Sequence, residues 1–97
     1  MNRPNLLTEE EINFRIEDLH LWKREGNQII RETVAANFAA AVGIINSIAI
    51  ISEAMDHHPD IQLYGWNKLR ITLSTHDKGG LTKLDFELAK KIDDLTY

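Results

Sequence analysis

The sequence has 97 residues, of which 43% are hydrophobic and 27% charged, and this ordinary globular composition argues against disorder. Its formal net charge is −4, which disfavours nucleic acid as the main partner because phosphate binding needs a basic face. The absence of cysteine excludes structural disulfides, thiolate metal ligands and a cysteine nucleophile. The length predicts one domain, residues 1–97, whose modest folding margin favours self-association.

The N-terminal quarter predicts a short helix followed by a hairpin. Met1 to Asn5 lack the apolar core of a signal peptide, and together with the absence of cysteine this favours a cytoplasmic location. Thr8 and Glu11 have the spacing of a capping box, and apolar residues follow them at helical intervals. Gly26 and Asn27 then predict a turn between two strands, over 21–25 and 28–31.

Residues 34–51 form the most apolar part of the chain. Their number reaches the roughly 18 residues of a membrane span, but polar and small residues interrupt the run. We therefore expect a soluble helix that continues to about Met55, and no membrane partner. Two neighbouring apolar stripes predict burial on two sides, one against the sheet and one against a second subunit. The stripes are Phe38, Val42, Ile45 and Ala49, and Ile44, Ile48 and Ile51.

The C-terminal half predicts a second hairpin and a last helix. Pro59 disfavours a helical conformation at the preceding residue, so the long helix should end near the histidine pair. Residues 68–74 alternate as in a half-buried strand, and 61–64 is the expected partner strand. Thr82 with Asp85 opens the last helix. Together the elements predict an α+β fold in which three helices pack on one face of a four-stranded antiparallel sheet.

Three of the four histidines fall in two short segments, 53–59 at the end of the long helix and 74–77 at the end of the alternating strand. The ends of rigid elements hold side chains in place and leave them reachable from solvent, which suits a catalytic group. Histidine changes its charge near neutral pH and can both donate and accept protons. His57, His58 and His76 are therefore the candidate catalytic residues.

The same region resembles the pterin-4a-carbinolamine dehydratase family over about two-thirds of the chain. His-His-Pro at 57–59 is weak alone, but its combination with Ser-Thr-His at 74–76 is specific. The remaining residues of the resemblance are Glu53, Asn67, Lys68, Ile71 to Leu73, Gly80 to Thr82 and Asp85, with Leu21, Trp22, Leu88, Ala89, Ile92 and Asp93 further out.

This resemblance implies a reaction, the dehydration of 4a-hydroxytetrahydropterin to quinonoid dihydropterin, with no metal, nucleotide or redox cofactor. Family members act in this way on the spent cofactor of aromatic amino-acid hydroxylases. It implies that His57 and His76 are the general acid and base and that His58 binds or polarises the substrate. The implied pterin contacts, through side chains or backbone, are Asp56, Ser74, Thr75 and Asp77, and the carboxylates implied to orient the imidazoles are Glu53 and Asp85.

The resemblance also implies partners. Family members are commonly tetramers, which agrees with the two apolar stripes, so we expect a homo-oligomer. Some members bind the dimerisation helices of a transcription factor, and an interaction module that uses residues 34–51 is the alternative function. One departure is Ile61, where a tryptophan is common in the family, and 59–66 is one residue longer than in the animal proteins. Tyr64 and Trp66 are the possible pocket aromatics.

Plainer interpretations stay open beside these. Glu53, His57 and His76 could form a zinc-type ligand set, although we expect no metal because the resembling family is metal-free. Asp85 could be a helix-capping residue alone, and Tyr64 and Trp66 could be ordinary hairpin packing. The three histidines could also be unrelated surface residues, or the fold could persist without activity.

Overall fold

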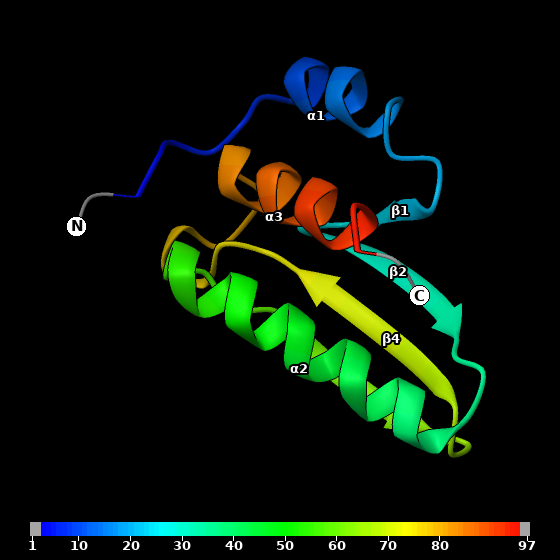
Figure 1. Ribbon diagram of the computed structural model, residues 1–97. Helices are drawn as coiled ribbons and strands as arrows, with labels where there is room; N and C mark the ends of the chain where they lie inside the picture. The colour runs from blue at the N-terminus through cyan, green and yellow to red at the C-terminus, as the bar shows by residue number, and fades with distance from the viewer. Residues whose placement is uncertain (1–2, 96–97) are drawn as a thin grey trace.

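The architecture is a four-stranded antiparallel sheet covered on one face by three helices (Figure 1). The computed structural model describes residues 3–95. The strand order in the sheet is β1-β2-β4-β3, which confirms the predicted α+β fold with its two hairpins. The elements in chain order are α1 (Glu9–Ile16), β1 (Trp22–Glu25), β2 (Gln28–Val34), α2 (Phe38–Met55), β3 (Asp60–Tyr64), β4 (Lys68–Leu73), the 3-10 turn η1 (His76–Lys78) and α3 (Lys83–Asp93).

One core lies between the sheet and the helices. β4 places alternate residues inward, as its sequence predicts, and β2 pairs with it so that Ile29 lies opposite Leu73. The inward side chains of α2 and α3 complete this core, whose fully buried large members include Ile29, Ile48, Leu69, Ile71, Leu73, Leu88 and Ile92. Burial of this apolar surface is the main force that holds α2 and α3 on the sheet.

α2 begins four residues later than its sequence predicts. Val34 pairs with Lys68 at the end of β2, so it belongs to the sheet. Asn37 then caps the helix, because its side chain accepts a hydrogen bond from the backbone N–H of Ala40 at 2.8 Å. The helix ends at Met55, and the next residue, Asp56, has a left-handed φ of 51° that turns the chain just before His57.

The two stripes of α2 have different surroundings. Ile44 and Ile48 pack in the core, which confirms that one stripe faces the sheet. Phe38 and Val42 of the other stripe are exposed, as is Ile50. By length and mean hydropathy (1.7) alone α2 resembles a membrane span, but a core helix passes the same test.

α3 is held at both ends. At its start Thr82 and Asp85 form the predicted capping box. Near its end Asp93 Oδ1 accepts hydrogen bonds from the indole of Trp22 at 2.9 Å and from Arg31 at 2.6 Å. These contacts fix α3 across β1 and β2, and thereby fix where its first turn meets the end of α2.

Candidate active site

His57 is buried against the first turn of α3. Its side chain is only 5% exposed, and its Nε2 lies 2.7 Å from Oδ1 of Asp85, which is fully buried. The left-handed residue Asp56 turns the chain inward at this point, so the imidazole enters the protein directly after α2 ends. A buried carboxylate is stable only with hydrogen-bond donors around it, and His57 is one of them.

Two threonines supply further hydrogen bonds to the same network. Thr75 Oγ1 donates to Asp85 Oδ2 at 2.9 Å, and the backbone N–H of Thr82 donates to the same oxygen at 2.9 Å. Since Thr75 donates its hydroxyl proton to the carboxylate, it accepts from the hydroxyl of Thr82, 2.8 Å away. Thr82 in turn accepts from the backbone N–H of Leu84 at 3.2 Å. Asp85 therefore joins three segments: the turn after α2, the end of β4 and the start of α3.

His58 lies on the outside of this network. Its side chain is 57% exposed, and its Nε2 lies 2.8 Å from Oε1 of Glu53, one turn back on α2. Consecutive histidines thus differ sharply, since His57 points into the protein and His58 points into solvent. Glu53 orients the exposed ring, whereas Asp85 orients the buried one.

His76 lies at the same end of the sheet, at the start of η1. Its side chain is 65% exposed, and its Nε2 is 3.9 Å from Oδ2 of Asp60, too far for a hydrogen bond but close enough for an ionic contact when the imidazole is protonated. Asp60 begins β3, only two residues after His58. His57 and Thr75 also share Asp85, so the structure brings the two histidine segments together.

The four expected pterin contacts have different environments. Asp56 and Asp77 are both exposed, and both lie within 4 Å of the guanidinium of Arg3. Ser74 is half-buried. Thr75 is fully buried: its hydroxyl is bonded to Asp85 and Thr82, and its N–H donates to the carbonyl of Gly80. Its side chain therefore supports the site from below, and a pterin contact through its backbone stays a prediction.

Tyr64 and Trp66 do not join the histidines within this chain. They lie at the β3–β4 hairpin, whose Tyr64 pairs with Lys68, whereas Asp60 and Leu73 mark the other end of the same two strands. Five residues of strand span roughly 15 Å. The idea that these aromatics complete the pocket is therefore wrong for a single chain, and both side chains are exposed at the hairpin.

The geometry also bears on the zinc interpretation. Glu53 pairs with His58 and not with His57, whose Nε2 is already held by Asp85. Within residues 3–95, no group of three or more His, Asp or Glu side chains is arranged to hold a metal ion. The histidines are therefore paired with carboxylates one by one.

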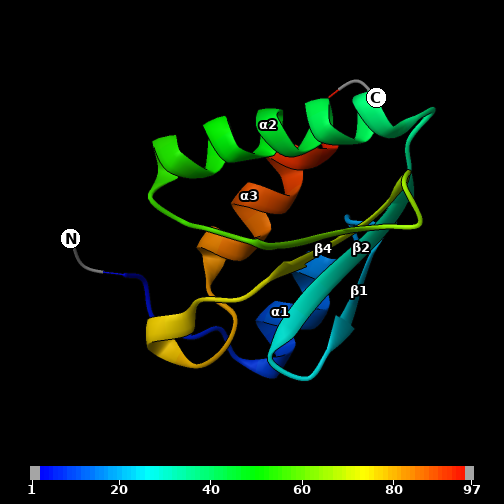
Figure 2. The ribbon, with the colours of Figure 1, turned by 90° about the horizontal axis from the view of Figure 1, so that it is seen from below.

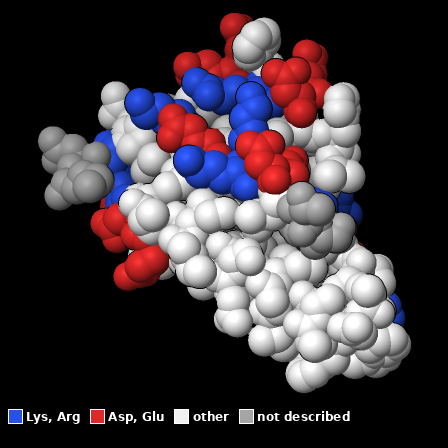
Figure 3. All heavy atoms as spheres, in the orientation of Figure 1, with Lys and Arg blue, Asp and Glu red and all other residues white. Residues whose placement is uncertain are grey.

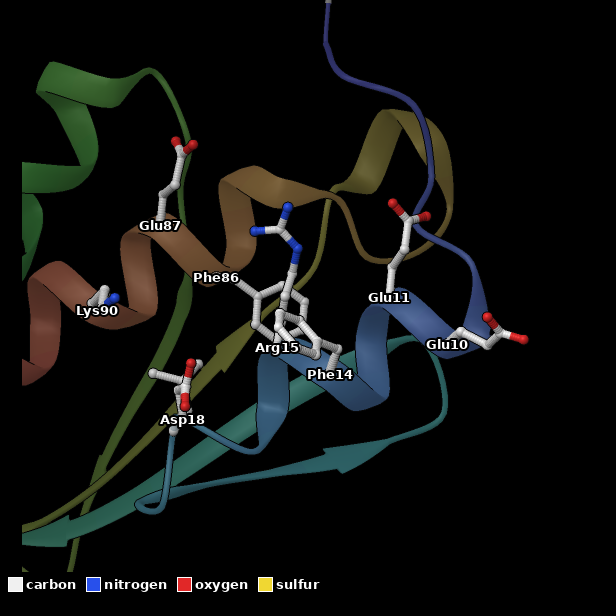
Figure 4. Close-up of a pocket in the computed structure, with 9 residues that line it drawn as sticks. Glu10, Glu11, Phe14, Arg15, Asp18, Phe86, Glu87 and Lys90 are labelled. Atoms are coloured by element: carbon white, nitrogen blue, oxygen red, sulfur yellow. The ribbon is translucent and has the colours of Figure 1, made fainter.

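A separate groove of about 650 Å³ lies between α1 and α3 (Figure 4). Phe14 and Phe86 both line it, together with charged side chains that include Arg15, Glu87 and Lys90. Its lining contains none of the three histidines or their partners. This groove and the histidine corner are thus in different places on the molecule.

This corner defines a class of site: three imidazoles, each beside its own carboxylate, at one end of a sheet. Such a site can give a proton to a leaving group and take another from the same substrate. Comparison with known proteins specifies the class further. Residues 5–95 match the family model described as pterin 4 alpha carbinolamine dehydratase, and the chain belongs to this family.

Individual relatives agree with this assignment. A protein of Roseiflexus castenholzii is 43% identical over 93% of this chain and 96% of its own, and one of Sulfurisphaera tokodaii is 44% identical over 92% and 95%. Both are provisionally assigned as pterin-4-alpha-carbinolamine dehydratases. The crystal structure of a transcriptional coactivator/pterin dehydratase from Brucella melitensis has a TM-score of 0.85 and 33% identity, over 92% of this chain and 96% of its own.

A more distant structure shares the fold alone. It is a pterin dehydratase-like protein identified as a RuBisCO assembly factor in the alpha-carboxysome, with a TM-score of 0.64, 22% identity, and coverage of 76% of this chain and 87% of its own. The fold therefore carries more than one role among proteins of this shape.

Sequence reasoning missed three residues at this corner. Thr82 was recognised only as a helix cap. Its capping pattern with Asp85 was the available signal, because the same two residues belong to the buried hydrogen-bond network. Asp60 follows Pro59 and could have been found as one more acidic residue beside the histidines. Arg3 gave no signal, because nothing in its local sequence shows that the N-terminal segment returns to this end of the sheet.

Proposed function

We propose that this protein dehydrates 4a-hydroxytetrahydropterin to quinonoid dihydropterin and water by histidine general acid–base catalysis. The 4a-hydroxyl leaves as water once one imidazole protonates it, and a second imidazole accepts the proton lost from a ring nitrogen. One proton is donated and one is accepted, so the net proton count of the enzyme is unchanged, and proton exchange with water then restores the starting protonation of each imidazole. In the cell this reaction would act in the cytoplasm to regenerate a pterin cofactor for hydroxylases.

The observation that carries the proposal is the buried pair of His57 and Asp85. As a carboxylate, Asp85 only accepts hydrogen bonds, so it holds a proton on Nε2 of His57. Proton exchange with a substrate is then left to Nδ1, in a ring whose orientation is fixed. In other acid–base sites a buried carboxylate likewise fixes the tautomer and the orientation of the catalytic imidazole.

His58 and His76 complete the proposed site from the exposed side. His76 is the partner of His57 in proton transfer, and His58 binds or polarises the substrate, held in place by Glu53. Asp56, Ser74 and Asp77 are available to contact the pterin ring because none of them is buried. The pterin then lies over the corner, with the Asp85 network beneath it.

A stopped-flow assay on chemically generated 4a-hydroxytetrahydropterin tests this function directly. We expect the wild-type protein to accelerate dehydration well beyond the buffer rate at equal pH. A double variant, His58→Ala with His76→Ala, is the matched control, since both side chains are exposed and their loss leaves the core intact. Wild-type rates equal to those of buffer or of this variant would eliminate the proposal.

A second candidate function rests on α2. Its outer face carries the exposed side chains of Phe38, Val42 and Ile50, and charged groups gather elsewhere, over α1 and α3 (Figure 3). An apolar face of this kind suits protein–protein contact. We propose that it joins copies of this chain into a dimer or tetramer, and that a partner helix is its alternative occupant.

Light scattering during size-exclusion chromatography separates these two occupants. Wild-type protein should elute as an oligomer, and Ile50→Lys should lower its mass, because a charge at a packed apolar interface is strongly unfavourable. Glu87→Lys, on α3, is the matched control and should leave the mass unchanged. A monomeric wild type would leave the face free and favour an interaction module.

A further inference from the structure

The N-terminal segment returns to the histidine corner. The backbone N–H of Leu7 donates to the carbonyl of Leu81 at 2.9 Å, and Leu6 packs over Gly80, where an added Cβ would lie 3.0 Å from Cδ2 of Leu6. Figure 2 shows this dark-blue segment beside the yellow turn η1. Residues 3–7 are therefore held against the loop that carries His76.

Arg3 lies at the point where this segment meets both histidine segments. Its Nη2 donates to Oδ2 of Asp56 at 3.3 Å, and its Nε lies 3.6 Å from Oδ2 of Asp77. Asp56 directly precedes His57, and Asp77 directly follows His76. One guanidinium thus bridges the two turns on which all three histidines are mounted.

The guanidinium is packed against protein. The Arg3 side chain is 19% exposed, although its partners Asp56 and Asp77 are 60% and 64% exposed. Its Nη1 is out of contact with solvent and has no hydrogen-bond acceptor in the described part of the chain. A cation in this position also offsets the repulsion between two carboxylates that would otherwise face each other across the site.

We infer that Arg3 is a positioning residue, which sets the separation of His76 from the His57–His58 turn by bridging Asp56 and Asp77. The inference rests on the proposed dehydratase function. Arg3 acts through the two aspartates and does not itself transfer a proton. A loss of Arg3 should therefore misalign acid and base and lower kcat, with a smaller effect on KM through Asp56 and Asp77, the proposed pterin contacts.

The test compares three variants in the full-length protein: Arg3→Gln, Arg3→Lys and Arg24→Gln. Arg24 is the matched control, because it is 25% exposed and pairs with one exposed carboxylate, Glu9, away from the histidines. Arg3→Gln should lower kcat by about 2–5-fold, the range for partly exposed ion pairs, with KM within about twofold. Arg3→Lys should recover at least part of this loss, and Arg24→Gln should match the wild type.

Two results would overturn the assignment. The first is a wild-type kcat and KM in Arg3→Gln. The second is a change in KM alone, which would mean that Arg3 affects substrate binding and not the alignment of acid and base. If the wild-type protein itself fails to dehydrate the substrate, the proposed function fails, and amide hydrogen exchange then decides about Arg3. Faster exchange over residues 76–80 in Arg3→Gln than in Arg24→Gln supports the bridge, and equal exchange removes it.

Discussion

The first turns of α1 and α3 carry the same capping motif and do very different things. Thr8 with Glu11 and Thr82 with Asp85 both form complete capping boxes. The first box is exposed and satisfies only its own helix, whereas Thr82 and Asp85 are fully buried. Asp85 accepts the capping hydrogen bond at Oδ2 and binds His57 through its second oxygen, Oδ1. Glu11 accepts the capping hydrogen bond at Oε1 in the same way, but it is exposed and holds none of the described histidines. Because it is buried, the capping box of α3 also holds His57 in place, which the exposed capping box of α1 cannot do for any histidine.

The largest test of this difference compares a buried histidine with an exposed one. His57→Ala and His76→Ala should each slow dehydration by about 10²–10⁴-fold, the usual contribution of a general acid or base. Only His57→Ala should also reduce the free energy of unfolding, by about 3 kcal/mol, because it leaves the buried carboxylate of Asp85 short of a donor. Stopped-flow rates and urea denaturation measure the two effects. Equal stability losses would contradict the contrast in burial.

The next test changes the acidic member of each capping box while keeping its shape. Asp85→Asn should lower kcat by about 10–100-fold, because an amide no longer holds the proton on Nε2 of His57. Glu11→Gln, the matched change on α1, should leave kcat at the wild-type value. Both variants are assayed side by side at equal pH. A wild-type kcat in Asp85→Asn would mean that Asp85 only caps α3 and does not support catalysis.

This contrast also shows how far the sequence could lead. Alternation in β4 and the hairpin at Gly26 predict the sheet well, because strand patterns and turn residues act locally. The capping patterns of Thr8 and Thr82 predict both helix starts for the same reason. They look alike in sequence, and only the packing of α3 against β4 and the end of α2 decides which of them is buried. That long-range contact could not be predicted from local spacing.

The errors have a similar physical origin. The resemblance implied a pterin contact at Thr75 without deciding between side chain and backbone, and the alternation of β4 turns the side chain inward. Tyr64 and Trp66 were considered because aromatics stack on flat rings, whereas the direction of β3 carries them to the far end of the sheet. The start of α2 was placed too early because Val34 suits a strand as well as a helix.

Thr75→Val tests the buried hydroxyl itself. The change keeps the shape of the side chain but removes the donor to Asp85 and the acceptor for Thr82. We expect a loss of about 1–3 kcal/mol in the free energy of unfolding, typical of buried polar groups left without partners. Thr75→Ser retains the hydroxyl and should lose less, by urea denaturation. A Thr75→Val protein as stable as the wild type would show that the network is not coupled to folding.

The smallest expected effect belongs to the exposed box on α1. The pKa of Glu11 is lowered from its ordinary value of 4.5, first by the backbone hydrogen bond from Thr8 and then by the Thr8 side chain. Its folded pKa is depressed, so its charge adds stability that is fully present above pH 4.5 and is lost as pH falls through the folded pKa. Glu11→Gln should therefore lower Tm slightly at neutral pH, and the difference from wild type should shrink as the pH falls below 4.5. Glu10→Gln is the control: it removes a charge from the same turn but leaves the capping box intact, so it measures the effect of the helix dipole without the cap. A Tm difference for Glu11→Gln that does not change with pH would mean that its charge adds nothing to the cap, and the exposed box would then stabilise α1 through neutral hydrogen bonds alone.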